Sequence, residues 1–380
     1  MNADVLLDAL RNHGFGLISG VPCSYLTPLI NATIDSPTTR YINAANEGEA
    51  VAICSGAELG GVRSVAMFQN SGLGNAVSPL TSLNAIFRIP VLLITTWRGQ
   101  PGKKQDEPQH SLVGRVMPKL VDTMEIPYAM FPADQAELDH VLARAIKSMD
   151  ATGLPFALFM EDGTIDKREL QTKPPTRDLK RLAPPEIPTS TLDVDECLAS
   201  IATIASQAEA AVLATTGFTG RALYNVGDRA NQLYMVGSMG CISSLALGVA
   251  LACPQRHVIA IDGDGAFLMR MSALCAVADA APRNLTHIVL DNGVHDSTGA
   301  QATLAHRVDI PAVAAACGYP NVEVADTVKS LEILLRSDAQ SLRLIYVRTR
   351  PRENRDLPRP SITPEQVAHR LRKWLHGESV

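Results

Sequence analysis

The sequence is poor in aromatic residues, and its cysteines show no pairing pattern. Aromatic residues make up 4% of the 380 residues. The seven cysteines are odd in number, widely spread and without a Cys-x-x-Cys pair, which argues against a disulfide framework or a zinc site. Because Ala, Val, Leu and Gly are abundant while aromatics are scarce, the composition favours closely packed helix-on-sheet layers over a β-sandwich.

The sequence also lacks an excess of positive charge and any long apolar run. Its formal net charge of −5 argues against a nucleic-acid or anionic-membrane partner. No apolar stretch approaches the ~20 residues that cross a bilayer, and the first residues lack the basic region of a signal peptide. We therefore expect a soluble, cytoplasmic protein in which an anionic ligand needs a local basic pocket.

Short β-branched apolar runs alternate with longer helical patterns along most of the chain. This alternation is typical of an α/β fold with parallel sheets covered by helices. The segment 171–191 is different, because it is rich in proline and charge with little periodicity, and it predicts an extended linker. We therefore expect two doubly wound domains, 1–170 and 192–380, which repeat an architecture but not a sequence.

The apolar runs and helical patterns define the expected elements. The expected strands are Phe15–Ser19, Arg40–Ala44, Ser64–Gln69, Val91–Thr95, Pro155–Met160, Ala211–Thr215, Leu233–Met235, Val258–Asp262, His287–Leu290 and Leu344–Arg348. The expected helices include Tyr25–Ile34, Glu47–Leu59, Asn75–Ile86, Gln135–Met149, Ile242–Ala252, Phe267–Ala280 and Thr327–Arg336.

The strongest motif is a buried strand that runs into Gly263-Asp264-Gly265. Asn292 follows Asp264 by 28 residues, at the end of the next strand. Because parallel strands end at one edge of a sheet, the carboxylate and the amide can face one crevice, where two hard oxygen ligands suit Mg²⁺. The glycines let the backbone approach a diphosphate, which the N-terminal amides of the next helix can bind. Taken alone, Gly-Asp-Gly is more often an ordinary turn.

In this context the motif resembles the signature of thiamine-diphosphate-dependent enzymes. The resemblance implies thiamine diphosphate and Mg²⁺ as cofactors, with metal ligands from Asp264, Asn292 and the Val294 carbonyl. It also implies that the Gly237 carbonyl accepts from the cofactor's 4′-amino group and that Met239 is an apolar wedge beneath it, although Met239 alone reads as a core residue. The implied cofactor-binding residues are Thr216, Gly237, Ser238, Met239, Gly263, Asp264, Gly265, Ala266, Asn292 and Val294. Asp291 stands where many members have Asn, which leaves open whether a second carboxylate faces the metal.

Glu47 and Glu49 lie where a strand leads into a helix. Glutamate in a first helical turn is common, because it interacts favourably with the helix dipole. The resemblance points to Glu47, rather than Glu49, as the acid that bonds the cofactor's pyrimidine and promotes loss of its C2 proton. Glu47 belongs to the first domain and Asp264 to the second. Since the family binds its cofactor between such domains of two chains, a homodimer or a dimer of dimers is implied.

Several longer blocks resemble the two-domain phosphonopyruvate and sulfopyruvate decarboxylases, which lack a middle domain. The blocks at 97–110 and 291–299 resemble the phosphonopyruvate group more closely, although Cys23 departs from the usual acidic residue. The resemblance implies decarboxylation of 3-phosphonopyruvate to phosphonoacetaldehyde and carbon dioxide in phosphonate biosynthesis. The candidate substrate-binding cations are Arg98, Lys103 and Lys104, and the candidate proton-transfer residues are His110 and His295.

Other interpretations remain open from the sequence. Sulfopyruvate decarboxylases are often split into two short chains, whereas this chain is continuous, and a carboligase would use the same cofactor. In a non-catalytic diphosphate-binding module the glycines would bind phosphate while Glu47 would be structural. The three cations could equally form a solvated surface cluster, and a lone histidine is more often structural than catalytic.

Overall fold

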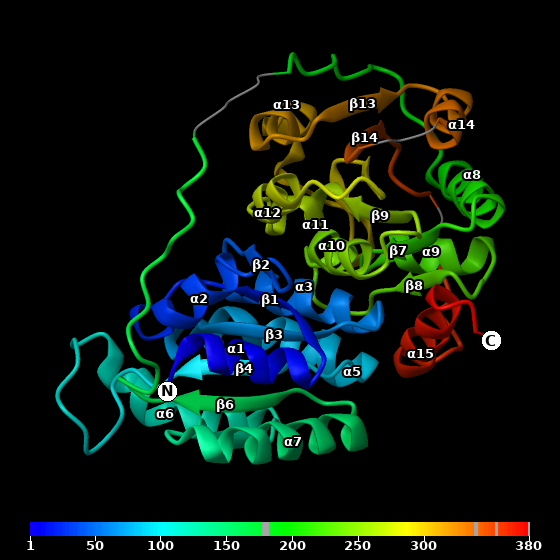
Figure 1. Ribbon diagram of the computed structural model, residues 1–380. Helices are drawn as coiled ribbons and strands as arrows, with labels where there is room; N and C mark the ends of the chain where they lie inside the picture. Colours follow the sequence, from blue (N-terminus) through cyan, green and yellow to red (C-terminus); the bar gives the residue numbers. More distant parts are fainter. Residues whose placement is uncertain (177–181, 338–340, 354–355, 379–380) are drawn as a thin grey trace. The chain divides into compact units, whose positions relative to one another are not determined.

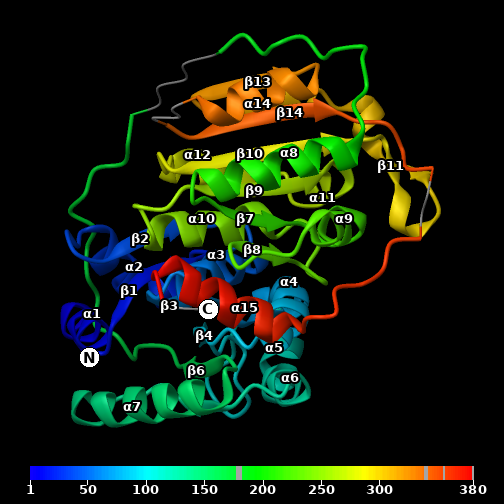
Figure 2. The same cartoon turned by 90° about the vertical axis from the view of Figure 1, so that its right-hand side faces the viewer.

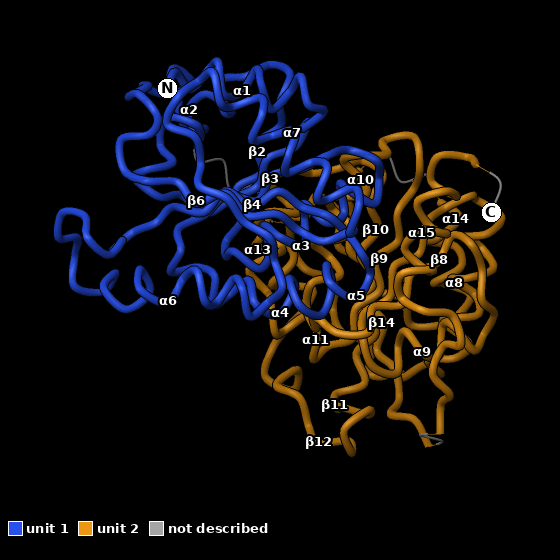
Figure 3. Tube along the Cα trace, turned by 90° about the horizontal axis from the view of Figure 1, so that it is seen from below, with its two compact units in different colours: residues 1–177 blue, residues 178–380 orange. Residues whose placement is uncertain are grey.

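The chain folds into two compact units, residues 1–177 and 178–380 (Figure 3). This computed structural model describes residues 1–176, 182–337, 341–353 and 356–378. None of the helices in these ranges has the length and apolar character needed to cross a bilayer. The described part of the expected linker 171–191 contains neither helix nor strand, while residues 177–181 of that linker lie outside the described residues.

Unit 1 is built on a parallel six-stranded sheet with the order β2-β1-β3-β4-β6-β5 (Figure 1). The strands are β1 Phe15–Gly20, β2 Arg40–Asn43, β3 Arg63–Gln69, β4 Leu92–Thr96, β5 Tyr128–Met130 and β6 Phe156–Met160. The helices are α1 Ala3–Asn12, α2 Thr27–Ile34, α3 Glu47–Leu59, α4 Leu73–Pro79, α5 Ala85–Phe87, α6 His110–Thr123 and α7 Gln135–Thr152. α1 and α7 pack together over one face, while α3 packs on β1 and β3 together with α4.

Apolar patterning explains this layering. β4 and β6 are buried at every position, and all of their residues are apolar except Thr95 and Thr96, as expected for central strands covered on both faces. In α1 the buried side chains Leu6 and Leu10 are four residues apart and enter the core with residues of α7. The expected single helix Asn75–Ile86 is divided, because a π-helical turn, Leu80–Asn84, separates α4 from α5.

Unit 2 is a second parallel six-stranded sheet, with the order β13-β14-β10-β9-β7-β8. Its strands are β7 Ala211–Ala214, β8 Gln232–Tyr234, β9 Val258–Gly263, β10 Leu285–Asp291, β13 Asn321–Ala325 and β14 Arg343–Arg348, and a separate hairpin pairs β11 Val294–His295 with β12 Gln301–Ala302. The helices are α8 Val194–Gln207, α9 Phe218–Val226, α10 Ile242–Ala252, α11 Asp264–Met269, α12 Ala273–Ala280, α13 Ile310–Cys317, α14 Val328–Arg336 and α15 Pro364–Leu375. Figure 2 shows the six strands following one another in this order.

The two sheets share one topology. Read from β8 to β13, the strands of unit 2 follow the same succession as those of unit 1 read from β2 to β5. Each sheet therefore has a switch point, between β1 and β3 and between β7 and β9, where successive connections leave in opposite directions. Open α/β sheets bind ligands in the crevice at the carboxyl ends of such strands. The expected fold, two doubly wound α/β domains, is confirmed.

One expected helix proves to be two. The predicted helix Phe267–Ala280 is interrupted after Met269, because Arg270 takes the non-helical dihedrals φ −138° and ψ 53°. The first piece, α11, begins at Asp264, three residues earlier than expected. Asp264 therefore stands in the first turn of a helix at the end of β9.

Candidate active site

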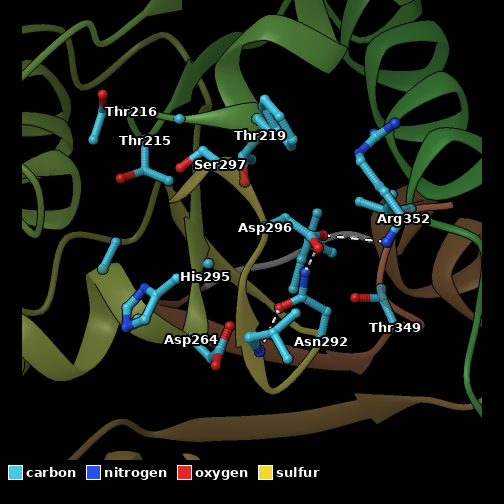
Figure 4. A pocket seen from close by; sticks show the side chains of 18 of the residues that line it. Thr215, Thr216, Thr219, Asp264, Asn292, His295, Asp296, Ser297, Thr349 and Arg352 are labelled. Atoms are coloured by element: carbon cyan, nitrogen blue, oxygen red, sulfur yellow. Dashed lines mark hydrogen bonds between the residues drawn. The ribbon is translucent and has the colours of Figure 1, made fainter. Parts of the chain in front are cut away.

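A pocket opens at the switch point of unit 2 (Figure 4). Two of its walls follow directly from β7 and β9, which are neighbours in the sheet. A third wall follows β10, where the chain turns through Asn292 into the hairpin β11–β12. The lining residues are Val194, Thr215, Thr216, Gly217, Phe218, Thr219, Met239, Gly263, Asp264, Gly265, Ala266, Leu290, Asn292, Val294, His295, Asp296, Ser297, Thr349 and Arg352. The lining therefore includes eight of the ten expected cofactor-binding residues, and only Gly237 and Ser238 are not among the lining residues.

Asp264 is buried in the wall of this pocket and forms no ion pair with the residues that the structure describes. Its side chain is 2% exposed, and Thr303 donates a hydrogen bond to its Oδ2. The pKa of Asp264 is raised to about 6, mainly by burial; the Thr303 hydrogen bond opposes this shift and the nearby charge of Asp291 adds to it. A carboxylate in such a place is stabilised by a bound divalent cation.

The Asn292 side chain is held in one orientation by its neighbours. Its Nδ2 donates to Asp296 Oδ2 at 2.7 Å, and its Oδ1 accepts from the Val294 amide at 3.0 Å. The Arg352 amide donates to the same Asp296 oxygen at 3.2 Å. With Nδ2 engaged, Oδ1 is the atom of Asn292 that can bind a metal, since it retains a second lone pair.

Asp291 is engaged in the turn rather than open to the pocket. Its Oδ1 accepts from the Gly293 amide at 2.9 Å, and its Oδ2 accepts from the Tyr346 hydroxyl at 2.6 Å. Burial and, to a smaller extent, this contact raise the pKa of Tyr346 well above its ordinary value. Asp291, which the sequence left open as a second ligand, is thus a hydrogen-bonded residue of the turn that presents Asn292.

The Gly-Ser-Met-Gly segment packs against the Gly-Asp-Gly turn. Ser238 and Gly240 both adopt left-handed backbone conformations, with φ of 49° and 84°. A Cβ atom on Gly265 would lie 2.6 Å from His295 Cε1 and 3.4 Å from Met239 Cε. A side chain at Gly265 would therefore collide with its neighbours. Because glycine has none, Met239 and His295 can both approach the turn closely.

Thr215 and Thr216 bring polar atoms from the end of β7. The Thr215 hydroxyl is buried and has no hydrogen-bond partner among the described residues. Gly217 follows with φ 88° and begins α9 as its N-cap residue. An unpaired buried hydroxyl in a pocket wall is costly unless a ligand completes its hydrogen bonds.

In unit 1 the two candidate glutamates have different surroundings. Both oxygens of Glu49 are engaged at the start of α3, accepting from the Ala45 amide at 3.1 Å and from Asn46 Nδ2 at 2.7 Å. Glu47 Oε2 accepts from Asn75 Nδ2 at 2.8 Å, while Oε1 accepts no hydrogen bond from the residues that the structure describes. Glu49 thus serves the helix start, and Glu47 retains an oxygen for a ligand.

Gly72 leaves the space that the Glu47 carboxylate occupies. A Cβ atom on Gly72 would lie 2.2 Å from Glu47 Oε1. The backbone of Gly72 has φ −77° and ψ −10°, which any residue can adopt. Contact with Glu47, rather than backbone conformation, therefore requires glycine here.

Arg98, one of the expected substrate cations, is already paired with a carboxylate. Its Nε and one terminal nitrogen each donate to an oxygen of Asp106 at 2.6 Å. This pair holds the pKa of Asp106 well below its usual range. His110 lies at the start of α6. Its Nδ1 is 3.2 Å from Asp106 Oδ1, but the two atoms are not aligned for a hydrogen bond. Its Nε2 is 3.3 Å from Gln69 Nε2.

The two expected lysines differ in their contacts. Lys103 Nζ donates to Glu161 Oε2 at 3.0 Å, and Glu161 also accepts from Gln100. Lys104 is exposed. Unit 1 therefore places Arg98 and Lys103 in ion pairs, not in a pocket of unpaired cations.

Four residues of these surroundings were not expected from the sequence: Asn75, Asp296, Thr303 and Arg352. Asp296 lies within the 291–299 block that carries the family resemblance, which is a usable signal. Thr303 and Arg352 lie in segments without a motif and contact the site only through the fold. Arg352 forms a two-pronged ion pair with Asp195 of α8 and lines the pocket.

Family comparisons agree with this arrangement. Residues 2–117 match the family "thiamine pyrophosphate enzyme, N-terminal TPP binding domain", and residues 217–347 match "thiamine pyrophosphate enzyme, C-terminal TPP binding domain". A solved structure of a "putative thiamin diphosphate-dependent enzyme" from Mycobacterium smegmatis is similar in fold, with a TM-score of 0.67 and 15% identity over 92% of this chain and 100% of that one.

Relatives of known activity are similar over nearly the whole chain. The phosphonopyruvate decarboxylase of Streptomyces viridochromogenes is 43% identical over 97% of this chain and 94% of its own. That of Streptomyces hygroscopicus is 42% identical over 98% and 94%. The sulfopyruvate decarboxylase of Methanosarcina acetivorans is 29% identical over 97% and 96%. Because this last relative aligns as one continuous chain, chain continuity does not separate the two activities.

Proposed function

The chain belongs to the thiamine pyrophosphate enzyme family, and from that membership we propose that it decarboxylates 3-phosphonopyruvate to phosphonoacetaldehyde and carbon dioxide, with thiamine diphosphate and Mg²⁺ as cofactors. The observation that carries the substrate is the whole-length similarity to two phosphonopyruvate decarboxylases, which exceeds that to the sulfopyruvate decarboxylase.

The residues of unit 2 fit a Mg²⁺-bound diphosphate. Asp264, the Asn292 Oδ1 and the Val294 carbonyl would hold the metal, and these are the hard oxygen donors that Mg²⁺ prefers. Burial raises the pKa of Asp264, and a divalent cation bound there would stabilise its carboxylate form. The amides that open α11 and the unpaired Thr215 hydroxyl offer donors to phosphate oxygens.

Glu47 and the two histidines supply the proton chemistry. When bound, the cofactor supplies an electron sink for the electron pair released as carbon dioxide leaves. Glu47 holds a proton at the oxygen that Asn75 leaves free, where it can bond a pyrimidine nitrogen. His295, against Gly265 at the pocket wall, and His110, beside Asp106, are the candidates for returning a proton to the product carbon.

A substrate assay tests this proposal. Purified protein with thiamine diphosphate and Mg²⁺ is given phosphonopyruvate, sulfopyruvate or pyruvate, and carbon dioxide release is measured. We expect the highest kcat/KM with phosphonopyruvate and loss of activity when either cofactor is omitted. A preference for sulfopyruvate would assign the second activity, which the full-length similarity to its single-chain decarboxylase supports. Cofactor binding without any carbon dioxide release would instead indicate a non-catalytic module.

We place the active site between two chains of a homodimer, or of a dimer of dimers. The support is that Glu47 and Asp264 belong to different compact units that share one sheet topology. Mixing Glu47→Gln protein with Asp264→Asn protein, after dissociation and reassociation, tests it. Random pairing restores one intact site in half of the dimers, or about a quarter of wild-type activity. No recovery would place both residues of each site on one chain.

A further inference from the structure

A second, larger cavity lies in unit 2 beside the pocket at the switch point. Its volume is about 440 Å³, within the range of small-molecule sites. It shares Thr216, Gly217 and Ser297 with the first pocket. The other lining residues are Gly220, Arg221, Tyr234, Met235, Val236, Arg359, Pro360, Ile362, Pro364 and Val367.

The charge of this cavity is positive. Arg221 and Arg359 line it, and no carboxylate does. Neither arginine forms an ion pair with any residue that the structure describes. Asp228, which accepts from the hydroxyl of the lining residue Tyr234 at 2.8 Å, is itself paired with both terminal nitrogens of Arg370. Its charge is therefore compensated behind the cavity wall.

The two arginines stand on elements that are tied together. Arg221 lies in α9, where its guanidinium rests 5.6 Å from the Phe218 ring centroid. The segment that carries Arg359 is hydrogen-bonded to α9 both before and after Arg359. Asn225 Nδ2 donates to the Pro358 carbonyl at 3.2 Å, and the Tyr224 hydroxyl lies 2.7 Å from Ser361 Oγ. The spacing of the two cations is thus set by the fold in advance of ligand binding.

We propose that Arg221 and Arg359 form the subsite that binds the terminal phosphonate of the substrate. This inference rests on the proposed function. A phosphonate carries up to two negative charges and three acceptor oxygens, which suit the planar donors of arginine. The cavity shares Thr216, Gly217 and Ser297 with the pocket proposed for the cofactor, so an anion bound by these donors would lie beside the cofactor. The cations first suggested by the sequence are less suited, because Asp106 and Glu161 already neutralise Arg98 and Lys103.

Binding measurements on the holoenzyme test the subsite without turnover. The probe is 3-phosphonopropanoate, which has both anionic groups of the substrate but no keto group, titrated calorimetrically into protein saturated with thiamine diphosphate and Mg²⁺. We expect Arg221→Gln or Arg359→Gln to weaken its binding about 10- to 100-fold, the loss of one charge-assisted contact. Arg283→Gln, an exposed arginine that lines neither cavity, is the matched control and should bind as the wild type does.

A second titration distinguishes the two anions that these cations could bind. If they served the cofactor, the same variants would weaken thiamine diphosphate binding instead, and the proposal would be overturned. Unchanged binding of both ligands would overturn it as well. The proposed function can fail separately from the subsite. If the wild-type protein released no carbon dioxide from phosphonopyruvate, but the arginine variants still bound the phosphonate probe more weakly than the wild type, the subsite would stand and the proposed reaction would be wrong. Circular dichroism confirms that each variant is folded.

Discussion

Replacement of Glu47 by Gln separates the chemistry of this carboxyl group from its packing. Glutamine has nearly the same shape, and its side-chain oxygen can still accept the hydrogen bond from Asn75 that Glu47 Oε2 accepts at 2.8 Å. What is lost is the exchangeable acid proton. A positioned general acid or base contributes about 10²- to 10⁴-fold to a rate, or about 3–5 kcal/mol of the barrier.

We therefore expect Glu47→Gln to lower kcat for carbon dioxide release by at least about 10²-fold while the free energy of unfolding changes by less than about 1 kcal/mol. The assay uses saturating thiamine diphosphate and Mg²⁺, and cofactor binding is measured in parallel by fluorescence quenching. Urea unfolding of the cofactor-free protein gives the stability. Turnover near that of the wild type would refute the role of Glu47.

Glu49 offers an internal control two residues away. Its oxygens accept from the Ala45 amide and from Asn46 at the start of α3, and its side chain is 0% exposed. Glu49→Gln removes the negative charge from this helix start and weakens both contacts, so we expect a loss of about 1–2 kcal/mol in stability. Because the side chain is engaged with the helix, kcat of the folded enzyme should stay within about threefold of wild type. A larger fall in kcat for Glu49→Gln than for Glu47→Gln would reverse the assignment.

Two further predictions follow from the surroundings of these sites. Gly72→Ala should displace Glu47, because the new Cβ would lie 2.2 Å from Glu47 Oε1, and we expect kcat to fall about tenfold or more. Gly74→Ala is the control: no atom lies within 4 Å of its Cβ position, so this variant should keep its activity. Folding raises the pKa of Asp264 from 3.8 to about 6, so the stability that its proton contributes is complete below pH 3.8 and is lost as the pH rises through 6. Between pH 4 and 7, the free energy of unfolding of the metal-free wild type should therefore fall by up to about 3 kcal/mol relative to that of Asp264→Asn, as measured by denaturant titration. Saturating Mg²⁺ should reverse this loss. A difference between the two proteins that does not change with pH would contradict the prediction.

The parts of the fold that the sequence predicts well are those with a strong local pattern. The central strands β4, β9 and β10 each contain an apolar run, and each was expected within two residues of its bounds. β5 and β13 were not expected. β5 has only three residues, none of them fully buried, and β13 is buried at one position of five, so neither carries a clear apolar run. Edge strands gain their order from pairing with β6 and β14, which is a property of the tertiary fold.

The positions of the residues proposed to bind the metal could be predicted for a similar reason. Asp264 and Asn292 each stand directly after an apolar strand, and parallel pairing of β9 with β10 brings their strand ends to one edge. Asp296 and Thr303 fix these residues through side-chain hydrogen bonds across a turn and a hairpin. No local periodicity encodes such contacts, so only the folded chain reveals them.

The candidate substrate-binding charges show where sequence patterns stop being informative. A cluster such as Arg98, Lys103 and Lys104 appears cationic along the chain, but Asp106 and Glu161 cancel two of these charges once the fold brings them together. Arg221 and Arg359 are far apart in sequence and belong to no motif, yet they line one cavity because the segment after 356 is hydrogen-bonded to α9. The affinity of a site depends on the charges that remain uncompensated at the distances of the folded state. For this reason the phosphonate probe, rather than any count of basic residues, decides which cations bind the substrate.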